Sequence, residues 1–343
     1  MRIPENSEVL IEVGNLVSLT FAALLSANGI KVLVIDADEK IDTLYTDDFS
    51  IDDDELKFLK EIGYELKDHQ IDYSDFIKQT LKLLAKNLCS VIWKTSIKQH
   101  HKGKIEFELE KDEQIHHHKT SFHFKKEDII ISDKLNINLT NIFLMGWRII
   151  GVIKRTLNQT ILDTRFSESD LIKNQLEKVN KPSHLLNRIA RKKIKAFPNL
   201  IDSKLSLHLS QERKVEAGEL LPDLKIYDEK QKLETSLHHW CAYHQFSLIL
   251  FGNLIPTNLF AIARWIQLNY PIQFYYLPQT EKNESVFEYF KIRKGERKTM
   301  IIRPDLFIGL IHDAIDIDII DNYLSNFIKM KAKETPQANK NAI

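Results

Sequence analysis

The sequence has little cysteine and no excess of charge of either sign. Its 343 residues contain only Cys89 and Cys241, which are far apart and form no Cys-x-x-Cys or metal-ligand spacing. Such usage is typical of a reducing compartment. Lysine plus arginine and aspartate plus glutamate both number 48, so no net charge draws the chain to nucleic acid or to an anionic membrane surface. We therefore expect neither as a partner.

Long hydrophobic runs are also missing. No uninterrupted apolar stretch approaches the roughly 20 residues of a membrane-spanning helix, and residues 1–8 lack the apolar core of a signal peptide. The sequence therefore predicts a cytoplasmic protein without a membrane segment. With 343 residues, 43% of them hydrophobic, the chain is long enough for two domains with separate cores.

Glycine is scarce, and its scarcity matters most in residues 9–36. This stretch has the pattern of a βαβ unit: an apolar strand, a turn, an Ala/Leu-rich helix and a second strand. In a dinucleotide-binding unit, a G-x-G-x-x-G turn lets the backbone approach a pyrophosphate at the helix N-terminus. Here the glycine places hold Val13, Asn15 and Ser18, and Gly14 is one residue out of register. The pattern predicts a nucleotide-binding fold with an altered phosphate turn.

The residues of this turn allow two interpretations. Asp36, at the end of the second strand, can accept a hydrogen bond from a ribose hydroxyl or can be a solvated acid that caps the strand. Gly14 and Asn15 can still form a turn, because asparagine tolerates left-handed geometry. Val13 can adopt a positive φ only at a cost, because it is β-branched. Ser18 stands where a glycine would allow the helix to pack closely on the strand, and a hydroxyl is tolerable there.

Glu12 lies inside an otherwise apolar strand. A buried, unpaired carboxylate costs several kcal/mol, so we expect Glu12 to be exposed, paired or protonated. Near a phosphate its charge would repel the ligand.

The rest of the first half alternates helix and strand patterns. Helical spacing is found in residues 56–62 and 73–88, and Gly63 marks the first helix end. Strand patterns follow, and from Asn136 to about residue 200 the pattern is again helical, broken by Pro182. The predicted strands are residues 90–95, 104–110, 120–124 and 129–133.

A second unit begins near Ala217. Its predicted order of elements is that of a thioredoxin-like α/β sandwich. The strands are residues 246–251, 271–277, 299–305 and 307–310, with helices through 261–265 and 319–328. The polar tail after residue 330 is predicted to be disordered. We thus expect domains at 1–200 and 215–330 and a tail at 331–343.

Histidines gather in the predicted strands, at His100-His101, His116–His118 and His123. They could suggest a metal site. However, adjacent histidines on a strand alternate between its faces, and no carboxylate or cysteine spacing completes a ligand shell. A polar hairpin tip is the simpler interpretation, and we predict no metal.

Several motifs together resemble the flavin-dependent aromatic hydroxylases of the phenol hydroxylase and para-hydroxybenzoate hydroxylase group. Leu19-Thr20 follows the first turn as in that family, and Asp133 stands where a strand after a β-meander ends in G-A-D-G. Asn136 and Trp147 match the family's G-M-N helix. Further matches are residues 162–168 to L-D-T-Y-x-x-E-R, and Arg303-Pro304-Asp305 with Ala217-Gly218-Glu219 to the thioredoxin-like appendage.

Departures from the family pattern are equally specific. The resemblance implies a long segment between Asp133 and Asn136 that builds the substrate-covering sheet and a G-D-A-A-H-x-x-P loop against the flavin. Here only two residues, Lys134 and Leu135, lie between them. Ala37 replaces the arginine that often follows the ribose-binding acid, and the arginine-bearing loop that shields the flavin has no counterpart.

Two hypotheses follow for an α/β chain made of a truncated Rossmann-like FAD-domain remnant (βαβ, β-meander and helices) and a thioredoxin-like domain. The first is a non-catalytic relative of the hydroxylases without cofactor. It acts through protein association, as a homodimer or with a full-length hydroxylase. The alternative is a monooxygenase acting on an aromatic substrate. It binds FAD through a remodelled site made of Gly14, Asn15, Ser18, Asp36 and Asn136, with part of its cavity supplied by a second chain.

Overall fold

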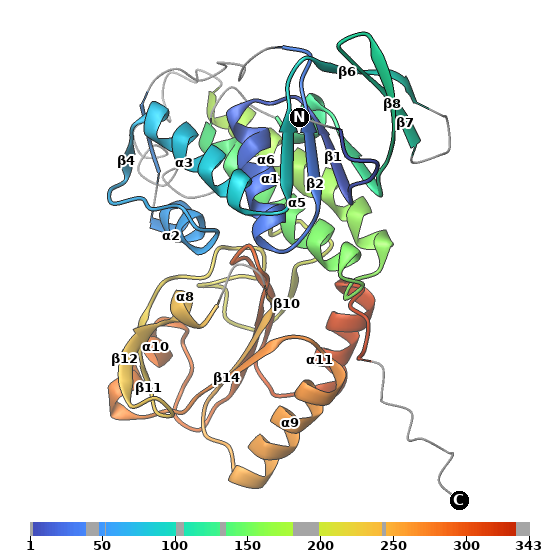
Figure 1. Ribbon diagram of the computed structural model, residues 1–343. Coiled ribbons are helices and arrows are strands. Elements are labelled where there is room, and N and C mark those ends of the chain that lie inside the picture. The colour runs from blue at the N-terminus through green and yellow to red at the C-terminus, as the bar shows by residue number, and fades with distance from the viewer. Residues whose placement is uncertain are drawn as a thin grey trace, which may run out of the picture. The chain divides into compact units, whose positions relative to one another are not determined.

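The chain forms two compact units, Met1–Ile153 and Lys154–Ile343, each with its own sheet (Figure 1). The structure, a computed structural model, describes residues 3–38, 48–51, 53–100, 106–130, 135–180, 199–241 and 245–333. The mixed α/β class is as predicted. The division at residue 153 lies before the boundary expected between 200 and 215. Helix α6 (Asp163–Asn180) belongs to the second unit, where its Glu168 accepts from Arg303.

The first unit is built on a four-stranded parallel sheet with strand order β5-β2-β1-β9. Its strands are almost uninterrupted apolar runs, which suits strands that are buried on both faces. Helix α1 (Leu16–Ala27) joins β1 to β2, as expected for a βαβ unit. The strands are β1 (Val9–Glu12), β2 (Val32–Ile35), β5 (Cys89–Ile92) and β9 (Phe122–Phe124).

Helices α3 and α5 pack on helix α1 of the same unit. Gly146 of α5 permits this approach, because a Cβ at Gly146 would lie 2.4 Å from Cδ2 of Leu24. Gly63, with φ of +109°, follows the first predicted helix as expected. The remaining elements are α2 (Asp53–Glu61), α3 (Tyr73–Lys86), α4 (Lys126–Ile129), α5 (Leu135–Ile153), β3 (Phe49–Ser50) and β4 (Gln70–Ile71).

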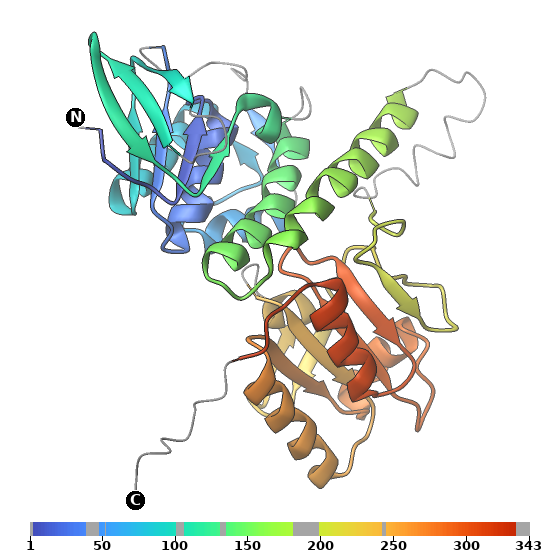
Figure 2. The same cartoon turned by 90° about the vertical axis from the view of Figure 1, so that its right-hand side faces the viewer.

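A three-stranded antiparallel sheet forms the expected β-meander (Figure 2). Asp112 and Glu113 make its tight turn, both with positive φ, the conformation of two-residue hairpins. The strands are β6 (Thr95–His100), β7 (Glu106–Lys111) and β8 (Gln114–Lys119).

The strand predicted at residues 129–133 is wrong. Ile129 ends helix α4, residues 131–134 lie outside the described part, and β9 is the strand that pairs with β1 after the meander. The Asp128 carboxylate accepts a hydrogen bond from the Lys125 backbone N–H at 2.9 Å, and this local bond favours a helix start over a strand. Asp133, the expected counterpart of the G-A-D-G aspartate, lies outside the described residues. Residues 125–134 separate β9 from α5.

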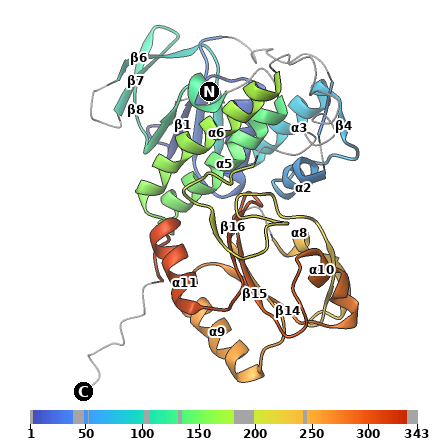
Figure 3. The ribbon, with the colours of Figure 1, turned by 180° about the vertical axis from the view of Figure 1, so that it is seen from behind.

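The second unit has a five-stranded sheet of order β10-β16-β15-β13-β14. Strands β13 and β14 are parallel, β15 is antiparallel to β13 and β16, and β10 is parallel to β16. Helices α9 and α11 lie on one face and α10 on the other (Figures 1 and 3). The strands are β10 (Leu207–Leu209), β13 (Ser247–Phe251), β14 (Gln273–Leu277), β15 (Lys298–Ile302) and β16 (Ile308–His312).

The helices of this unit follow the predicted order. Helix α11 continues into a π-helical turn at Tyr323–Phe327, so the final helix occupies the predicted place. The tail beyond Lys333 lies outside the described residues. The other elements are α8 (Leu237–Trp240), α9 (Pro256–Asn269), α10 (Glu284–Tyr289), α11 (Ile317–Asn322), the hairpin β11 (Lys225–Asp228) with β12 (Leu233–Ser236), and the 3₁₀ turns Gln159–Leu162 and Glu281–Asn283.

Candidate functional site

The carboxyl ends of three neighbouring strands meet in the first unit. Gly14 follows β1, Asp36 follows β2 and Trp93 follows β5, and these strands are adjacent in the sheet. In open α/β sheets, ligands bind outside the carboxyl ends of the strands. The predicted residues Gly14, Asn15, Ser18 and Asp36 are therefore brought together at the edge where a dinucleotide would bind.

Asp36 is hydrogen-bonded to the backbone of its own turn. Its Oδ2 accepts from the Gly14 N–H at 2.6 Å, and its Oδ1 accepts from the Asp38 N–H at 2.9 Å. The residue is only 8% exposed. Both carboxylate oxygens accept from backbone donors, as in a strand cap, but the carboxylate is buried and not solvated as expected.

Asn15 is the N-cap of helix α1. Its Oδ1 accepts from the Ser18 N–H at 2.9 Å, which satisfies one of the free donors at the helix start. Among the described residues, neither Asn15 Nδ2 nor Ser18 Oγ has a hydrogen-bond partner, although both atoms are buried. The cap thus takes a backbone donor that a phosphate would otherwise use.

Val13 has a backbone conformation that normally favours glycine. Its φ is +120°, and its N–H donates to the Ile35 carbonyl at 2.9 Å. A β-branched residue is a genuine outlier at positive φ, and such strain costs about 1–3 kcal/mol. The backbone strain that the sequence predicts for Val13 at positive φ is therefore present in the structure.

Trp93 lies against Gly14 and occupies the space beside the turn. A Cβ added to Gly14 would be 2.4 Å from Cζ3 of Trp93 and 2.6 Å from its Cη2. The indole is half-buried, and sequence analysis did not single out Trp93. Its position directly after a strand of a nucleotide-type sheet was the signal that could have identified it.

Glu12, the last residue of β1, is paired. Its Oε2 lies 3.1 Å from Nε2 of His123 on the neighbouring strand β9. The hydrogen bond from His123 lowers the pKa of Glu12, against the opposing effect of burial. The pairing agrees with one of the three states expected from the sequence, and it places a carboxylate near the end of the strand that leads to the turn.

The other predicted residues do not join this group. Asn136 is in helix α5, but its side chain lies outside the described part, as do the His100 side chain and all of His101. His118 is buried between Ser7 Oγ at 3.0 Å and the Pro4 carbonyl at 2.8 Å. In the described part of the chain, no three histidine, cysteine or acidic residues gather as a metal site would require.

The residues of the turn are partly engaged by the protein itself. Each Asp36 oxygen accepts one backbone N–H, which leaves further lone pairs of the carboxylate open, and Asn15 accepts one N–H at the start of helix α1. The Trp93 ring lies where a side chain at position 14 would have to go.

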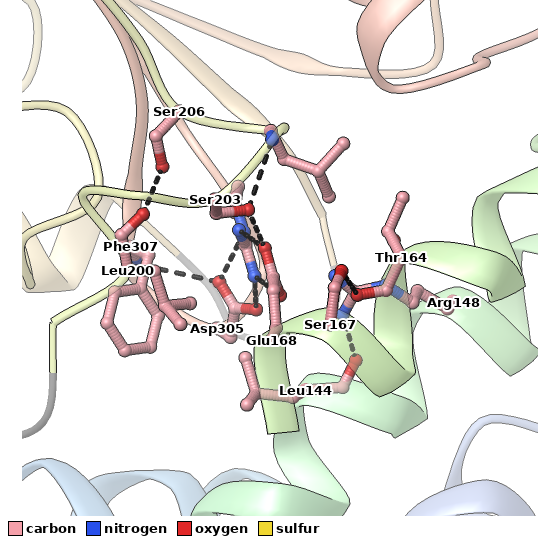
Figure 4. A network of polar contacts seen from close by, with 12 residues as sticks. Leu144, Arg148, Thr164, Ser167, Glu168, Leu200, Ser203, Ser206, Asp305 and Phe307 are labelled. Carbon is pink, nitrogen blue, oxygen red and sulfur yellow. Dashed lines mark hydrogen bonds and ion pairs between the residues drawn. The ribbon is translucent and has the colours of Figure 1, made fainter. Parts of the chain in front are cut away.

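A second polar cluster is buried in the second unit (Figure 4). Arg303 donates to Glu168 at 2.7 and 2.9 Å and to Asp305 at 2.6 and 3.0 Å, and Ser203 Oγ donates to Glu168 at 2.5 Å. Burial by itself lowers the pKa of Arg303, but the two carboxylates outweigh burial and raise it. Because Arg303 and Glu168 are fully buried and bound to each other, we assign the cluster to stability.

Comparison with known proteins yields matches among solved structures only. No protein-family model and no curated protein matches the chain. A ternary complex of aklavinone-11 hydroxylase with FAD and aklavinone has 10% identity, a TM-score of 0.66, and coverage of 96% of this chain and 100% of that chain. The substrate-free rebeccamycin biosynthetic enzyme RebC has 8% identity and a TM-score of 0.67, with coverage of 96% and 100%.

A third solved structure is the anhydrotetracycline hydroxylase OxyS from Streptomyces rimosus, with 10% identity, a TM-score of 0.63, and coverage of 95% of this chain and 100% of that chain. At such low identity the likeness concerns the fold, and the chain has the fold of the flavin-dependent aromatic hydroxylases.

Among the helices of the described residues, none has the length and apolarity needed to cross a bilayer.

Proposed function

We propose that this protein is a non-catalytic, cytoplasmic relative of the flavin-dependent aromatic hydroxylases that acts through protein association. The observation that carries the proposal is the turn after β1. Asp36 and Asn15 there bind the chain's own backbone, and Trp93 covers Gly14. Three contacts that a dinucleotide would need are thus engaged by the protein itself.

The short connection after β9 supports the same conclusion. Hydroxylation by a flavin needs a cavity that excludes water from the reacting centre. The resemblance places the sheet that covers this cavity between the strand after the meander and the next helix. Residues 125–134 alone occupy that interval here, and part of them forms helix α4. We infer that the first unit is a Rossmann-like remnant without its own substrate chamber.

The second unit gives no sign of a redox centre in its sheet. The order β16-β15-β13-β14, with β13 and β14 parallel, suits a thioredoxin-like domain, which we propose it to be. A thioredoxin-type centre needs two cysteines near the start of the helix after the first core strand. Residues 252–255, between β13 and α9, contain none, and Cys241 is buried. A scaffold role is the simpler interpretation.

Exposed apolar side chains on helix α9 favour association. Ile255, the N-cap of the helix, and Phe260 and Leu268 within it are 60%, 66% and 61% exposed. We propose either a homo-oligomer or a complex with an intact hydroxylase.

One observation favours the alternative, an FAD-binding monooxygenase with a remodelled site. Val13 retains the glycine-like backbone, and Asn15 Nδ2 and Ser18 Oγ are buried at the helix start without partners among the described residues. Such groups are what a bound phosphate could satisfy. This alternative requires Trp93 to move away from Gly14.

The visible spectrum of the purified protein distinguishes the two functions. A ligand that binds only the folded state raises the melting temperature. Because we propose that FAD does not bind, we expect no flavin absorbance and no change of melting temperature when FAD is added. Stoichiometric flavin in the protein, or a saturable rise of the melting temperature, would contradict the proposal.

Association is tested separately by light scattering. A single chain has a mass of 40.1 kDa, and a multiple of that mass indicates the homo-oligomer. If the mass is that of one chain, the complex with a co-expressed intact hydroxylase is the remaining form, and failure to form that complex would overturn the association proposal.

A further inference from the structure

A cleft of about 800 Å³ opens at one edge of the sheet in the second unit. It lies between the ends of β10 and β16, the start of β15 and the loop that precedes β15. Residues that matter for its chemistry are Arg293, Arg297, Lys298, His312 and Asp313. A cleft of about 300–1,000 Å³ is the usual size for a small-molecule site.

The cleft lies at the edge of the sheet that commonly binds ligands. Strands β13, β14, β16 and β10 all run in the same direction, because β15 is antiparallel to both β13 and β16. The carboxyl ends of these four strands therefore lie at the same end of the sheet. Ligands of α/β sheets bind outside the carboxyl ends of the strands. Leu209 and His312, the last residues of β10 and β16, both line the cleft.

A fixed ion pair forms one wall. Lys298, whose side chain is 3% exposed, binds Asp313 and donates to Ser210 Oγ at 2.8 Å. Asp313 also accepts from Ser210 Oγ and from the Gln211 N–H, each at 2.7 Å. Burial raises the pKa of Asp313, but these hydrogen bonds and the lysine outweigh burial and lower it. The Asp313 charge is thereby compensated within the protein.

Cations dominate the loop that precedes β15. Residues 291–297 contain four lysine or arginine residues and one carboxylate, Glu296. Internal bonds shape the loop: Glu296 accepts from the Arg293 N–H at 2.8 Å, and Arg297 Nε donates to the Asn253 carbonyl at 3.1 Å. Within the described residues, no ion pair involves the side chains of Lys291, Arg293 or Arg297, and all three are exposed.

These cations have the chemistry of an oxyanion site. Arginine forks bind carboxylates and phosphates through paired, charge-assisted hydrogen bonds. The remaining lining carboxylates, Glu212 and Glu296, are outnumbered by Lys291, Arg293 and Arg297. We propose that the cleft binds a small oxyanion with two or more charged groups, a class shared by oligophosphates and polycarboxylates. Arg293 and Arg297 hold the ligand, and the pair Lys298–Asp313 supports one wall. The proposal is independent of the proposed function.

Isothermal titration with pyrophosphate and with citrate tests the site, using the full chain at low salt. We expect saturable binding of at least one probe, weakened about tenfold or more when Arg293→Ala and Arg297→Ala are combined. Both side chains are exposed, so the melting temperature should stay close to that of the wild type. The control is Arg264→Ala, an exposed cation on helix α9, which should leave binding unchanged.

The comparison of probes identifies the ligand class. Tighter binding of pyrophosphate assigns the cleft to phosphates, and tighter binding of citrate assigns it to carboxylates. No binding of either probe up to about 10 mM, or equal binding by the double variant and the wild type, would overturn the proposal.

Discussion

The guanidinium of Arg303 binds both carboxylate oxygens of Glu168, at 2.7 and 2.9 Å, although the two residues are 135 positions apart. Their side chains have no solvent exposure. This pair joins helix α6 to the sheet of the second unit, and Asp305 completes it from the same strand–turn segment as Arg303. A buried ion pair of this geometry is costly to break, because removing one partner leaves the other charged and unsolvated.

Replacing Arg303 with methionine should therefore destabilise the second unit strongly. Arg303→Met leaves Glu168 and Asp305 without their cation, and we expect a loss of about 3–5 kcal/mol in the free energy of unfolding. Urea unfolding followed by circular dichroism measures it. The control is Arg213→Met, which removes an exposed pair with Glu216 and should cost less than about 1 kcal/mol. Equal effects would show that the buried cluster contributes no special stability.

Replacing Asp36 with asparagine should destabilise the protein in the absence of any nucleotide. The Asp36 carboxylate accepts from the Gly14 and Asp38 N–H groups, and bonds to a charged acceptor contribute about 1.5–3 kcal/mol each. A loss of about 1–3 kcal/mol is expected for Asp36→Asn, measured by urea unfolding. Asp38→Asn, at an exposed position, is the control. If Asp36 served only to bind a ribose, Asp36→Asn would not change the free energy of unfolding of the ligand-free protein. That result would count against the capping role.

Glycine at position 13 should stabilise the first unit. The φ of +120° at Val13 is strained for valine but accessible to glycine. We expect Val13→Gly to raise the free energy of unfolding by about 1 kcal/mol, because relief of strain exceeds the entropic cost of glycine. Val13→Ala keeps a Cβ at positive φ and should gain less. Differential scanning calorimetry separates the two variants, and a lower melting temperature for the glycine variant would contradict the expected strain.

The first unit should lose stability as the pH falls below about 6.5. Burial lowers the pKa of His118, so the unfolded chain binds a proton at a higher pH than the folded chain does. The unfolded state is then favoured by protonation, and the stability present above the unfolded pKa is lost as the pH decreases. The pKa of Glu12 is also lowered in the folded state. The stability that Glu12 contributes is lost at a more acidic pH, as the pH falls through the pKa of Glu12 in the folded state.

Variants at neighbouring histidines test this pH dependence. His118→Gln should reduce the loss of stability between pH 7.5 and pH 5.5, as followed by urea unfolding at about these two pH values. His117→Gln removes an exposed histidine of the same strand and should leave the pH profile as it is in the wild type. Identical profiles for all three proteins would exclude His118 as the titrating group.

Local patterns were sufficient for most of the elements. The βαβ unit, the meander and helices α3 and α9 follow from apolar periodicity and from residues such as Asp72, which caps α3. The failure at residues 129–133 has a local cause as well. A short apolar run does not distinguish strand from helix, and the hydrogen bond between Asp128 and Lys125 decided for a helix start.

The sequence by itself determined the two α/β units, the loss of the glycines in the first turn and the short interval after the meander, because these depend on residue type and spacing along the chain. Only the tertiary structure decided that Trp93 lies against Gly14, that Asp36 binds its own turn, and that Arg303 meets Glu168. These contacts join residues far apart in the chain. Their geometry is set by the order of the strands and by the packing of side chains at the strand ends, which no local periodicity encodes.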